Sequence, residues 1–380
     1  MGTKRKLTVG LVFDDSLDRP DGVQQYVQRV AEWLTSQGHD VHFLVGETIR
    51  TDLKNMHSLS RNLRVKFNGN TMSMPLPTTK KELKKVLADY NFDILHVQMP
   101  YSPFMAGRLM KMVSKQTAVV GTFHILPYSK LVLVANRILG WVNWRSGKRL
   151  TTVMAVSPPA QIFARKLYGY ECQIVPNPIR VRDFMGTSAT QEHAVTRIVF
   201  LGRLVERKGA RHLLEAVAYL REQHLYDGPF EVVIGGKGEL YEQLQHFVRQ
   251  NGLKDVVRFP GFVPETDKAA LLATADIAVF PSVSGESFGI SLLEAMAASP
   301  GVVLAGNNPG YASVMHGLHD RLVEPLDTPA FAQSLADWLG NAANRTTAAT
   351  EQQKYVQQYD VAIVGAQIET VYEQALQTKR

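Results

Sequence analysis

The chain has 380 residues, 45% of them hydrophobic and 20% charged, which is typical of a globular protein and long enough for two α/β domains. Its formal charge of +7 is compatible with phosphorylated ligands or an anionic membrane surface, whereas no zinc-ligand spacing or RNA-binding motif supports nucleic acid. No apolar run approaches the roughly 20 residues of a membrane span. The single cysteine, Cys172, excludes an internal disulfide, fits a reducing compartment and is expected to be a buried structural thiol.

The first half of the chain alternates short apolar runs with longer stretches of helical periodicity. Residues 22–38 carry apolar side chains at helical spacing, and the apolar runs on either side predict strands. Because apolar strands flanked by helices indicate a parallel sheet covered on both faces, this half is expected to be a doubly wound unit. Its predicted strands are residues 7–13, 40–46, 93–98, 118–124, 152–157 and 172–177.

The run at 7–13 is interpreted as a first strand and not as a signal peptide, because Asp14 and Asp15 end it and no cleavage site follows. The two aspartates lack a third ligand at a diagnostic spacing. They are therefore interpreted as part of a solvated loop and not as a metal site.

The second half repeats this alternation after a polar, aperiodic stretch at 180–196, which is interpreted as a linker. Its predicted strands are residues 197–203, 231–236, 256–262, 277–282 and 301–306. The expected organisation is an N-terminal domain at 1–180, a C-terminal domain at 197–355 and a helical segment at 356–380 that packs back on the N-terminal domain.

The densest set of candidate site residues follows the strand at 277–282. Glu286 and Glu294 are eight residues apart across a strand-to-helix junction, with small residues between them that allow a ligand close to the backbone. A helix N-terminus there would offer N–H groups and a partial positive charge to a phosphate. If Glu294 lies two turns into the helix, the two glutamates are roughly 12 Å apart at ~1.5 Å per residue, about the reach from the sugar to the ribose of a nucleotide sugar.

Two cations lie in the segment FLGRLVERKG (200–209), between a strand and a helix. Arg203 and Lys208 could project to one anionic point, as a diphosphate leaving group requires, although each alone is equally compatible with a surface cation. The glycine-rich turn at 234–240 lacks a full dinucleotide fingerprint and is weak evidence for a cofactor.

Two residues of the first half stand where ligands approach an open α/β sheet. Gly22 begins a helix after the first strand, and His124 ends the strand at 118–124. Since ligands bind outside the carboxyl ends of such strands, His124 is expected to have a functional role.

Four segments occur in this order along the second half of the chain: FLGRLVERKG, GGKGEL, GFVPETDKAALLATADIAVFPS and GESFGISLLEAMA. Together they resemble the retaining glycosyltransferases of GT-B fold with an E-x7-E motif, the glycosyltransferase family 4 type. The first half of the chain also matches in register, at DGVQQYVQRVAEWLTSQGHDV, FDILHVQ and GTFH, so the resemblance covers nearly the whole chain. Within the family, GESFGI and YDVAIVGAQIETVYE are most similar to the phosphatidylinositol mannosyltransferases. The resemblance implies two Rossmann-like doubly wound domains facing across a cleft that holds the active site.

The resemblance also implies roles at matching positions. Arg203 and Lys208 would bind the donor diphosphate, Glu286 the transferred sugar and Glu294 the ribose, with His124 beside the reaction centre. The residues implied in catalysis are His124, Arg203, Lys208 and Glu286. Those implied in donor binding are Gly22, Arg203, Lys208, Val263, Glu265, Lys268, Glu286, Phe288, Gly289, Ile290 and Glu294.

The sequence departs from the family pattern at two turns. Asp21–Gly22 replaces a paired glycine, and Pro176–Asn177–Pro178 replaces Pro-Asn-Gly, which leaves the donor pose open. Glu265 and Lys268 stand where relatives contact the base. A carboxylate there could accept both N–H groups of guanine, which uracil lacks, and this favours a GDP-sugar.

A basic segment at 78–90 holds Lys80, Lys81, Lys84 and Lys85 with Leu83, Val86 and Leu87 on a predicted amphipathic helix. Such a helix can lie on an anionic bilayer, and the stretch 131–150 adds Trp141 and Trp144 with flanking cations. The alternative is that both stretches are ordinary packing helices. Gln24 is implied near the acceptor.

The expected protein is therefore a monomeric enzyme that transfers mannose from GDP-mannose to a phospholipid such as phosphatidylinositol, peripheral on the cytoplasmic face of the cell membrane. It would need no permanently bound cofactor or metal, with Mg²⁺ left open as a stimulating ion. The alternatives are a UDP-glucose-type transferase acting on diacylglycerol or a soluble acceptor, and a non-catalytic nucleotide-sugar binding protein. An NAD-dependent dehydrogenase is disfavoured because no glycine-rich fingerprint follows the first strand.

Overall fold

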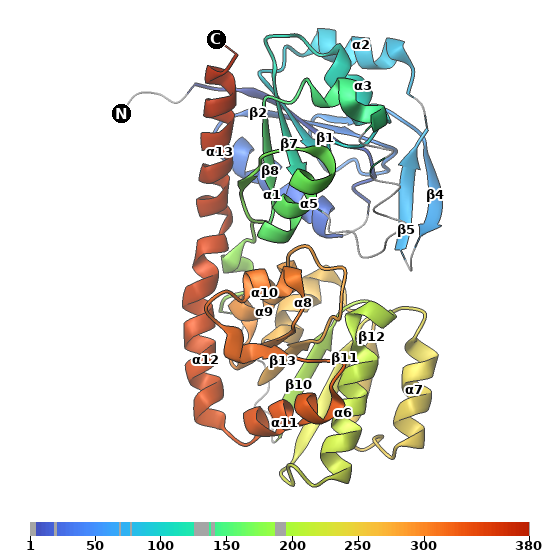
Figure 1. Ribbon diagram of the computed structural model, residues 1–380, viewed down its shortest axis with the longest axis vertical. Coiled ribbons are helices and arrows are strands. Elements are labelled where there is room, and N and C mark those ends of the chain that lie inside the picture. Colours follow the sequence, from blue (N-terminus) through green and yellow to red (C-terminus); the bar gives the residue numbers. More distant parts are fainter. Residues whose placement is uncertain are drawn as a thin grey trace. The chain divides into compact units, whose positions relative to one another are not determined.

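The computed structural model divides into two compact units, Met1–Pro178 with Val361–Arg380 as unit 1, and Ile179–Asp360 as unit 2 (Figure 1). Each unit contains its own parallel sheet and its own hydrophobic core. The residues that the structure describes are 5–18, 21–67, 70–76, 78–124, 137, 141–186 and 195–379.

The described part of unit 1 is built on a seven-stranded parallel sheet of order β3-β2-β1-β6-β7-β8-β9. Every residue of the two central strands β6 and β7 is buried, because their apolar runs are covered on both faces. The strands are β1 (Thr8–Phe13), β2 (Asp40–Val45), β3 (Met56–Ser58), β6 (Ile94–Gln98), β7 (Ala118–Phe123), β8 (Thr152–Ala155) and β9 (Gln173–Ile174).

Two hydrophobic cores lie on opposite faces of this sheet. The alternating residues Val9, Leu11 and Phe13 of β1 pack with α1 and the C-terminal helix α13, whereas Val12 packs with α2 and α3. The helix α2 begins with a capping box between Thr79 and Glu82, which satisfies two backbone donors. The helices of unit 1 are α1 (Gly22–Ser36), α2 (Lys80–Asp89), α3 (Met105–Met112), α5 (Pro158–Tyr168) and α13 (Val361–Gln377).

Three strands of unit 1 do not appear among the strands that the sequence predicts. β3 is short, and β4 (Asn62–Phe67) pairs with β5 (Asn70–Pro75) as an antiparallel hairpin. The segment is rich in Asn, Arg, Lys, Ser and Thr and lacks the apolar run by which the other strands are recognised.

The described part of unit 2 contains a six-stranded parallel sheet of order β12-β11-β10-β13-β14-β15. The parallel sheets of both units confirm the predicted doubly wound fold. The strands are β10 (Thr196–Leu201), β11 (Phe230–Gly235), β12 (Val257–Gly261), β13 (Ile277–Phe280), β14 (Val302–Gly306) and β15 (Leu322–Val323). The helices are η1 (Val181–Asp183), η2 (Glu206–Lys208), α6 (Ala210–Glu222), α7 (Tyr241–Gln250), α8 (Glu265–Leu272), α9 (Ile290–Ala298), α10 (Pro309–Val314), η3 (His319–Arg321), α11 (Thr328–Leu339), α12 (Ala342–Tyr355) and η4 (Val356–Tyr359).

The strand order reverses between β10 and β13, which lie side by side although two strands separate them in sequence. The corresponding reversal in unit 1 lies between β1 and β6. Loops that leave the carboxyl ends of such neighbouring strands diverge and leave a crevice for a ligand. The candidate residues of each unit follow these strands or their neighbours.

Candidate active site

The loops that follow β10 and β13 are held together by a glycine. Gly209 has φ of 75°, and a Cβ atom at this position would lie 1.9 Å from the carbonyl oxygen of Pro281. Only glycine permits both the positive φ and this close approach. The turn η2 therefore lies against the end of β13, where the backbone N–H of Val283 donates to the carbonyl oxygen of Arg207 at 2.9 Å.

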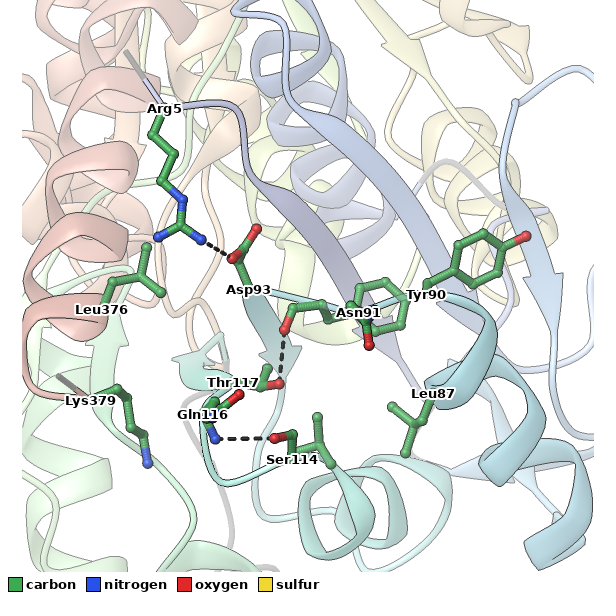
Figure 2. A pocket seen from close by; sticks show the side chains of 12 residues that line it. Arg5, Leu87, Tyr90, Asn91, Asp93, Ser114, Gln116, Thr117, Leu376 and Lys379 are labelled. Carbon is green, nitrogen blue, oxygen red and sulfur yellow. Dashed lines mark hydrogen bonds and ion pairs between the residues drawn. The ribbon is translucent and has the colours of Figure 1, made fainter.

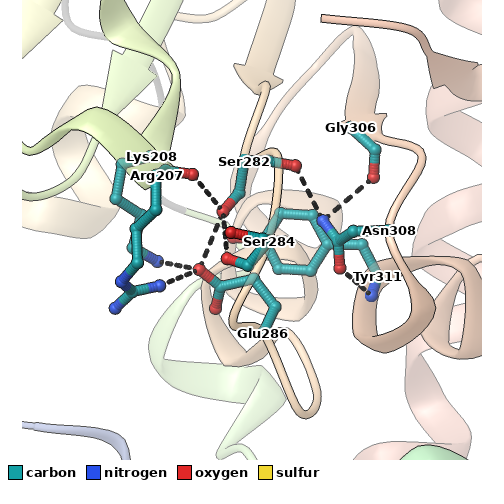
Figure 3. A network of polar contacts seen from close by, with 8 residues as sticks. All are labelled: Arg207, Lys208, Ser282, Ser284, Glu286, Gly306, Asn308 and Tyr311. Atoms are coloured by element: carbon teal, nitrogen blue, oxygen red, sulfur yellow. Dashed lines mark hydrogen bonds and ion pairs between the residues drawn. The ribbon is translucent and has the colours of Figure 1, made fainter. Parts of the chain in front are cut away.

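This packing brings two cations to Glu286. Arg207 Nη1 lies 2.6 Å and Lys208 Nζ lies 2.9 Å from the same oxygen, Glu286 Oε1 (Figure 3). The hydroxyl of Ser282 is 2.9 Å from this oxygen and 2.8 Å from the carbonyl oxygen of Arg207, and its one proton serves either acceptor. The Glu286 side chain is 14% exposed, so these contacts are made in a largely desolvated setting.

Electrostatics at this cluster favour the charged carboxylate. Burial alone would raise the pKa of Glu286, but Lys208 and Arg207 outweigh it and hold the pKa below its ordinary value. Burial lowers the pKa of Lys208, and the cations Arg207 and Arg203 add to this effect, while Glu286 opposes it. Two cations thus contact one carboxylate and a third acts on Lys208, an excess of positive charge that suits an additional anion.

Of the two predicted cations, Lys208 contacts Glu286, whereas Arg203 is an electrostatic neighbour of Lys208. Arg207 makes the shorter of the two ion pairs with Glu286, and it is absent from the residues that the sequence singles out. The signal that could have found it is the pair Arg207–Lys208, which gives three cations between the strand and Gly209.

The loop that carries Glu286 is held by a side chain of the neighbouring loop. Asn308 caps α10 by accepting from the N–H of Tyr311 at 3.1 Å, and its amide donates to the carbonyl oxygen of Ser282 at 2.8 Å (Figure 3). Phe288 is buried with its ring 5.9 Å from the ring of Tyr359. Gly289 is the N-cap of α9 and makes no side-chain cap, so the first turn from Ile290 presents backbone N–H groups where a phosphate could bind.

Glu294 belongs to a second ion-pair cluster. Its side chain is only 2% exposed, and Lys268 Nζ lies 2.9 Å from Glu294 Oε2 and 2.8 Å from Glu265 Oε1. Burial alone would lower the pKa of Lys268, but the two carboxylates outweigh it and raise the pKa. Glu265 is 45% exposed at the start of α8, and Val263 packs against Gly235 at the end of β11.

The expected spacing of the two glutamates needs a correction. Helix α9 begins at Ile290, so Glu294 lies just over one turn into it, and residues 286–289 are not helical. The separation of 12 Å assumed eight helical residues and does not apply. Glu286 and Glu294 are instead distinguished by their partners, Arg207 and Lys208 for the first and Lys268 for the second.

In unit 1, His124 follows β7 and is buried. Its Nε2 atom lies 2.7 Å from Gln98 Oε1 at the end of β6, and its ring packs edge-on against Tyr26 of α1. Burial lowers the pKa of His124 to about 3, so the imidazole is neutral at physiological pH. A neutral ring can exchange hydrogen bonds with a sugar, but it brings no positive charge to the reaction.

The remaining residues predicted in unit 1 lie at the start of α1. Gly22 is its first residue, after Asp21, whose side chain makes no cap. Gln24 is buried and donates to the carbonyl oxygen of Ser16 at 3.2 Å. The hydrogen-bonding capacity of Gln24 is thus partly used within the fold.

The interpretation of Asp14 as part of a solvated loop was wrong. Asp14 is buried, accepts from the N–H of Ala106 at 2.7 Å and bonds the hydroxyl of Ser102, which fixes the start of α3. Burial, only partly offset by these hydrogen bonds, raises the pKa of Asp14 to about 6. Within the described ranges, no group of three or more His, Cys, Asp or Glu residues could hold a metal ion.

The predicted basic helix is α2, and its apolar face is not available to a bilayer. Leu83 and Val86 are buried in the core of unit 1, so this apolar face packs inside the fold and does not lie on a bilayer, as expected for the alternative of an ordinary packing helix. Its lysines Lys80, Lys81, Lys84 and Lys85 are all exposed. They form a cationic surface, whereas Leu83 and Val86 of the same helix are buried.

The aromatic stretch 131–150 is described only at residue 137 and from residue 141 onward; the rest of it lies outside the described residues. In the helical residues 141–147, Trp141 is 83% exposed and Trp144 is 60% exposed. The ammonium group of Lys148 lies 3.5 Å from the centre of the Trp144 ring. No helix among the described residues is long and apolar enough to cross a membrane.

A cavity of about 530 Å³ lies at the opposite edge of the unit 1 sheet, where β1, β6 and β7 begin (Figure 2). Arg5 pairs with Asp93 at 2.5 Å, and Thr117 donates to the carbonyl oxygen of Phe92 at 2.8 Å. None of the predicted site residues lines it. Cys172, directly before β9, is buried as predicted, and burial raises the pKa of its thiol to about 12.

The sequence is similar to known glycosyltransferases along nearly its whole length. Residues 20–183 match the family described as Glycosyltransferase Family 4, and residues 190–358 match Glycosyl transferases group 1. The phosphatidyl-myo-inositol mannosyltransferase of Mycobacterium leprae is 30% identical over 97% of this chain and 96% of its own length. That of Mycolicibacterium smegmatis is 30% identical over 97% of this chain and 94% of its own length. The chain belongs to this family of glycosyltransferases.

Solved structures show the same fold at lower identity. A glycosyltransferase from Rickettsia africae has a TM-score of 0.74 at 16% identity and covers 98% of this chain and 99% of its own. HepE from Anabaena, in complex with UDP and glucose, has a TM-score of 0.71 at 18% identity over 97% and 100%. Together with the two parallel sheets, these neighbours give the GT-B class of fold.

Proposed function

We propose that this glycosyltransferase transfers mannose from GDP-mannose to phosphatidylinositol, with retention of configuration. The similarity over 97% of the chain to phosphatidyl-myo-inositol mannosyltransferases is the observation that carries the proposal. The contacts of Arg207 and Lys208 with Glu286, with Arg203 acting on Lys208, support it, because a departing nucleoside diphosphate gains negative charge that preorganised cations stabilise.

Each group of the site has a role in this proposal. Lys208 and Arg203 bind the diphosphate, and the first turn of α9 adds backbone N–H groups to it. The carboxylate of Glu286 accepts from sugar hydroxyls, and Glu294 accepts from the ribose. His124 is neutral and orients the sugar by hydrogen bonding instead of supplying charge.

The transfer assay is direct. The purified protein is mixed with vesicles containing phosphatidylinositol and with GDP-mannose or UDP-glucose, and the lipids are analysed by mass spectrometry and by NMR of the anomeric proton. A hexosylated phosphatidylinositol formed from GDP-mannose with an α linkage is the expected product. Transfer from UDP-glucose to diacylglycerol would establish the alternative transferase, and nucleotide binding without transfer or donor hydrolysis would establish a non-catalytic binding protein.

The base preference is tested at Glu265. Glu265→Gln should weaken GDP binding far more than UDP binding if its carboxylate accepts from the two N–H groups of guanine, since a neutral amide is the weaker acceptor. Calorimetry with both nucleotides measures the difference. Equal losses for GDP and UDP, or tighter UDP binding by the wild-type protein, would remove the argument for a guanine donor.

The lipid acceptor predicts a membrane surface on unit 1. Replacing Lys80, Lys81, Lys84 and Lys85 by glutamine should weaken binding to acidic vesicles by on the order of 10³-fold, because each of the four cations near an anionic surface contributes about 1 kcal/mol. Wild-type binding should fall with added salt. Nucleotide binding should be unchanged, because the donor residues lie mostly in unit 2. Co-sedimentation with vesicles measures both effects.

A matched variant separates the α2 surface from net charge. Lys54, Lys111, Lys115 and Lys166 are also exposed lysines of unit 1, and their replacement by glutamine removes the same charge. If this control loses as much vesicle binding as the α2 variant, net charge alone explains the binding. If neither loses binding but Trp141→Ser with Trp144→Ser does, the exposed tryptophans are the membrane contact.

A further inference from the structure

Arg207 and Lys208 are neighbours in the chain that share one acceptor atom. Both reach Glu286 Oε1, at 2.6 Å and 2.9 Å (Figure 3). Glu286 Oε2 accepts no hydrogen bond from the part of the chain that the structure describes. The carboxylate is therefore anchored at one oxygen and presents the other, although a carboxylate has about four acceptor positions in all.

The two cations differ in how firmly they are held. The backbone of Arg207 is fixed by the N–H of Val283, which donates to its carbonyl oxygen at 2.9 Å, and by the hydroxyl of Ser282 at 2.8 Å. The planar fork of its guanidinium favours a fixed geometry to a carboxylate. The ammonium group of Lys208 is a point charge on a flexible stem, and it can change partner when a diphosphate arrives.

We propose that Arg207 is a positioning residue for sugar transfer: its guanidinium holds Glu286 Oε1, so that Oε2 faces the sugar hydroxyls once Lys208 has moved to the donor diphosphate. This inference rests on the proposed function of the site as a nucleotide-sugar site. In the structure, Glu286 Oε1 pairs with both cations. With donor, one cation serves the phosphates and the other keeps the carboxylate ionised and aimed.

We expect the loss of Arg207 to lower mainly turnover, and the loss of Lys208 to lower both nucleotide affinity and turnover. In Arg207→Met, kcat should fall by roughly 10- to 100-fold, while the affinity for the nucleoside diphosphate stays within about threefold of wild type. In Lys208→Met, the affinity for the nucleoside diphosphate should fall by about tenfold or more, together with kcat. Arg207→Lys should recover part of the lost kcat, because it keeps the charge but loses the fork.

A pH profile adds a readout that a merely structural role would not move. The pKa of Glu286 is held low by Lys208 and Arg207 against the effect of burial. Removing Arg207 should therefore raise the pKa of Glu286. Because the ionised carboxylate is the active form, the variant should lose activity at a higher pH than the wild-type protein does as the solution is acidified. The other groups that face the cluster are Lys208, Arg203 beyond it, and Tyr311, whose pKa is raised well above its ordinary value by burial, so that it stays neutral.

The experiment measures kcat, KM and calorimetric affinity for wild type, Arg207→Met, Arg207→Lys, Lys208→Met and Ser282→Ala, with circular dichroism to verify folding. The nucleoside diphosphate and the donor are those that the wild-type protein binds and turns over, by transfer or by hydrolysis. If the proposed mannose donor or lipid acceptor is wrong, the reagents change but the comparison between the variants remains valid. Equal losses of nucleotide affinity in Arg207→Met and Lys208→Met would show that Arg207 is a phosphate ligand. The proposal would also be overturned if Arg207→Lys and Arg207→Met kept the wild-type kcat and lost activity at the same acidic pH as the wild-type protein. If Arg207→Met does not fold, Arg207→Lys and Ser282→Ala decide, since each disturbs the anchored oxygen while leaving Lys208 in place.

Discussion

Replacing Lys208 or Arg203 by alanine is expected to lower turnover by on the order of 10²-fold or more, as does the loss of a donor to charge that develops in a transition state. The nucleoside diphosphate gains charge as its bond to the sugar breaks, and each cation stabilises that charge more than it stabilises the intact donor. Lys208 lies in a largely desolvated cluster, where an electrostatic contact is worth more than in water.

The fold should tolerate both replacements, since Glu286 keeps its ion pair with Arg207 and its contact with Ser282 when Lys208 is removed. Single-turnover kinetics with saturating donor isolates the chemical step from donor binding. Lys254→Ala is the matched control, because Lys254 is an exposed lysine of the same unit, away from this cluster. Turnover close to wild type in Lys208→Ala or Arg203→Ala would contradict the assignment of the diphosphate site.

The sequence predicts most of the parallel strands because they are continuous apolar runs. β1, β7 and β14 begin and end within one residue of the predicted ranges, and their buried residues show why the pattern is so clear. The hairpin of β4 and β5 has no continuous apolar run; its signal in the sequence is the alternation of Leu63, Val65 and Phe67 with polar residues, which is typical of an antiparallel strand. Parallel sheet order was inaccessible from local pattern, since β10 and β13 become neighbours only through the crossover connections.

The residue types of the candidate site could be predicted from the sequence, but most of their contacts could not. Glu286, Glu294 and Lys208 stand in motifs, and motifs do not say that Glu286 pairs with both Arg207 and Lys208. Arg207 was missed because its role depends on Gly209, which lets the turn η2 lie against the end of β13. Such a contact is made between segments about 75 residues apart and has no local signature.

The same limit explains the two corrections on unit 1. The amphipathic pattern of α2 is equally that of a surface helix whose apolar face packs on a core, and the structure shows this second arrangement. Asp14 looks like a loop residue in the sequence, but its carboxylate is enclosed by Ser102 and the first turn of α3, more than 80 residues away. Burial of a polar side chain is set by the segments that pack over it, and these are not neighbours in sequence.

Lys268→Met is expected to lower the free energy of unfolding by about 3 kcal/mol, the range for breaking a buried ion pair by removing one partner. Glu294 is 2% exposed and would lose the cation that lies 2.9 Å from its carboxylate. Glu265→Gln is the matched control on the other side of the same ammonium group, and because Glu265 is 45% exposed its loss should cost at most about 1 kcal/mol. Urea unfolding monitored by circular dichroism measures both variants.

The pH dependence of this difference has a definite sign. The pKa of Lys268 is raised from its ordinary value of 10.5 by Glu294 and Glu265, which outweigh burial. A group whose pKa is raised in the folded state stabilises that state fully below its unfolded pKa, and this stabilisation is lost as the pH rises through the folded pKa. The gap in stability between wild type and Lys268→Met should therefore be constant from neutral pH up to about pH 10 and close only above it.

The double variant Lys268→Met with Glu294→Gln shows whether the loss comes from the stranded carboxylate. Removing both charges should restore much of the stability, because the desolvated charge that made the single variant costly is no longer there. Its nucleotide affinity should be lower than that of the wild-type protein if Glu294 is the ribose ligand, since glutamine is a weaker acceptor for two hydroxyl groups. A double variant with restored stability and wild-type nucleotide affinity would show that the Lys268–Glu294 pair is structural and that the ribose is bound elsewhere.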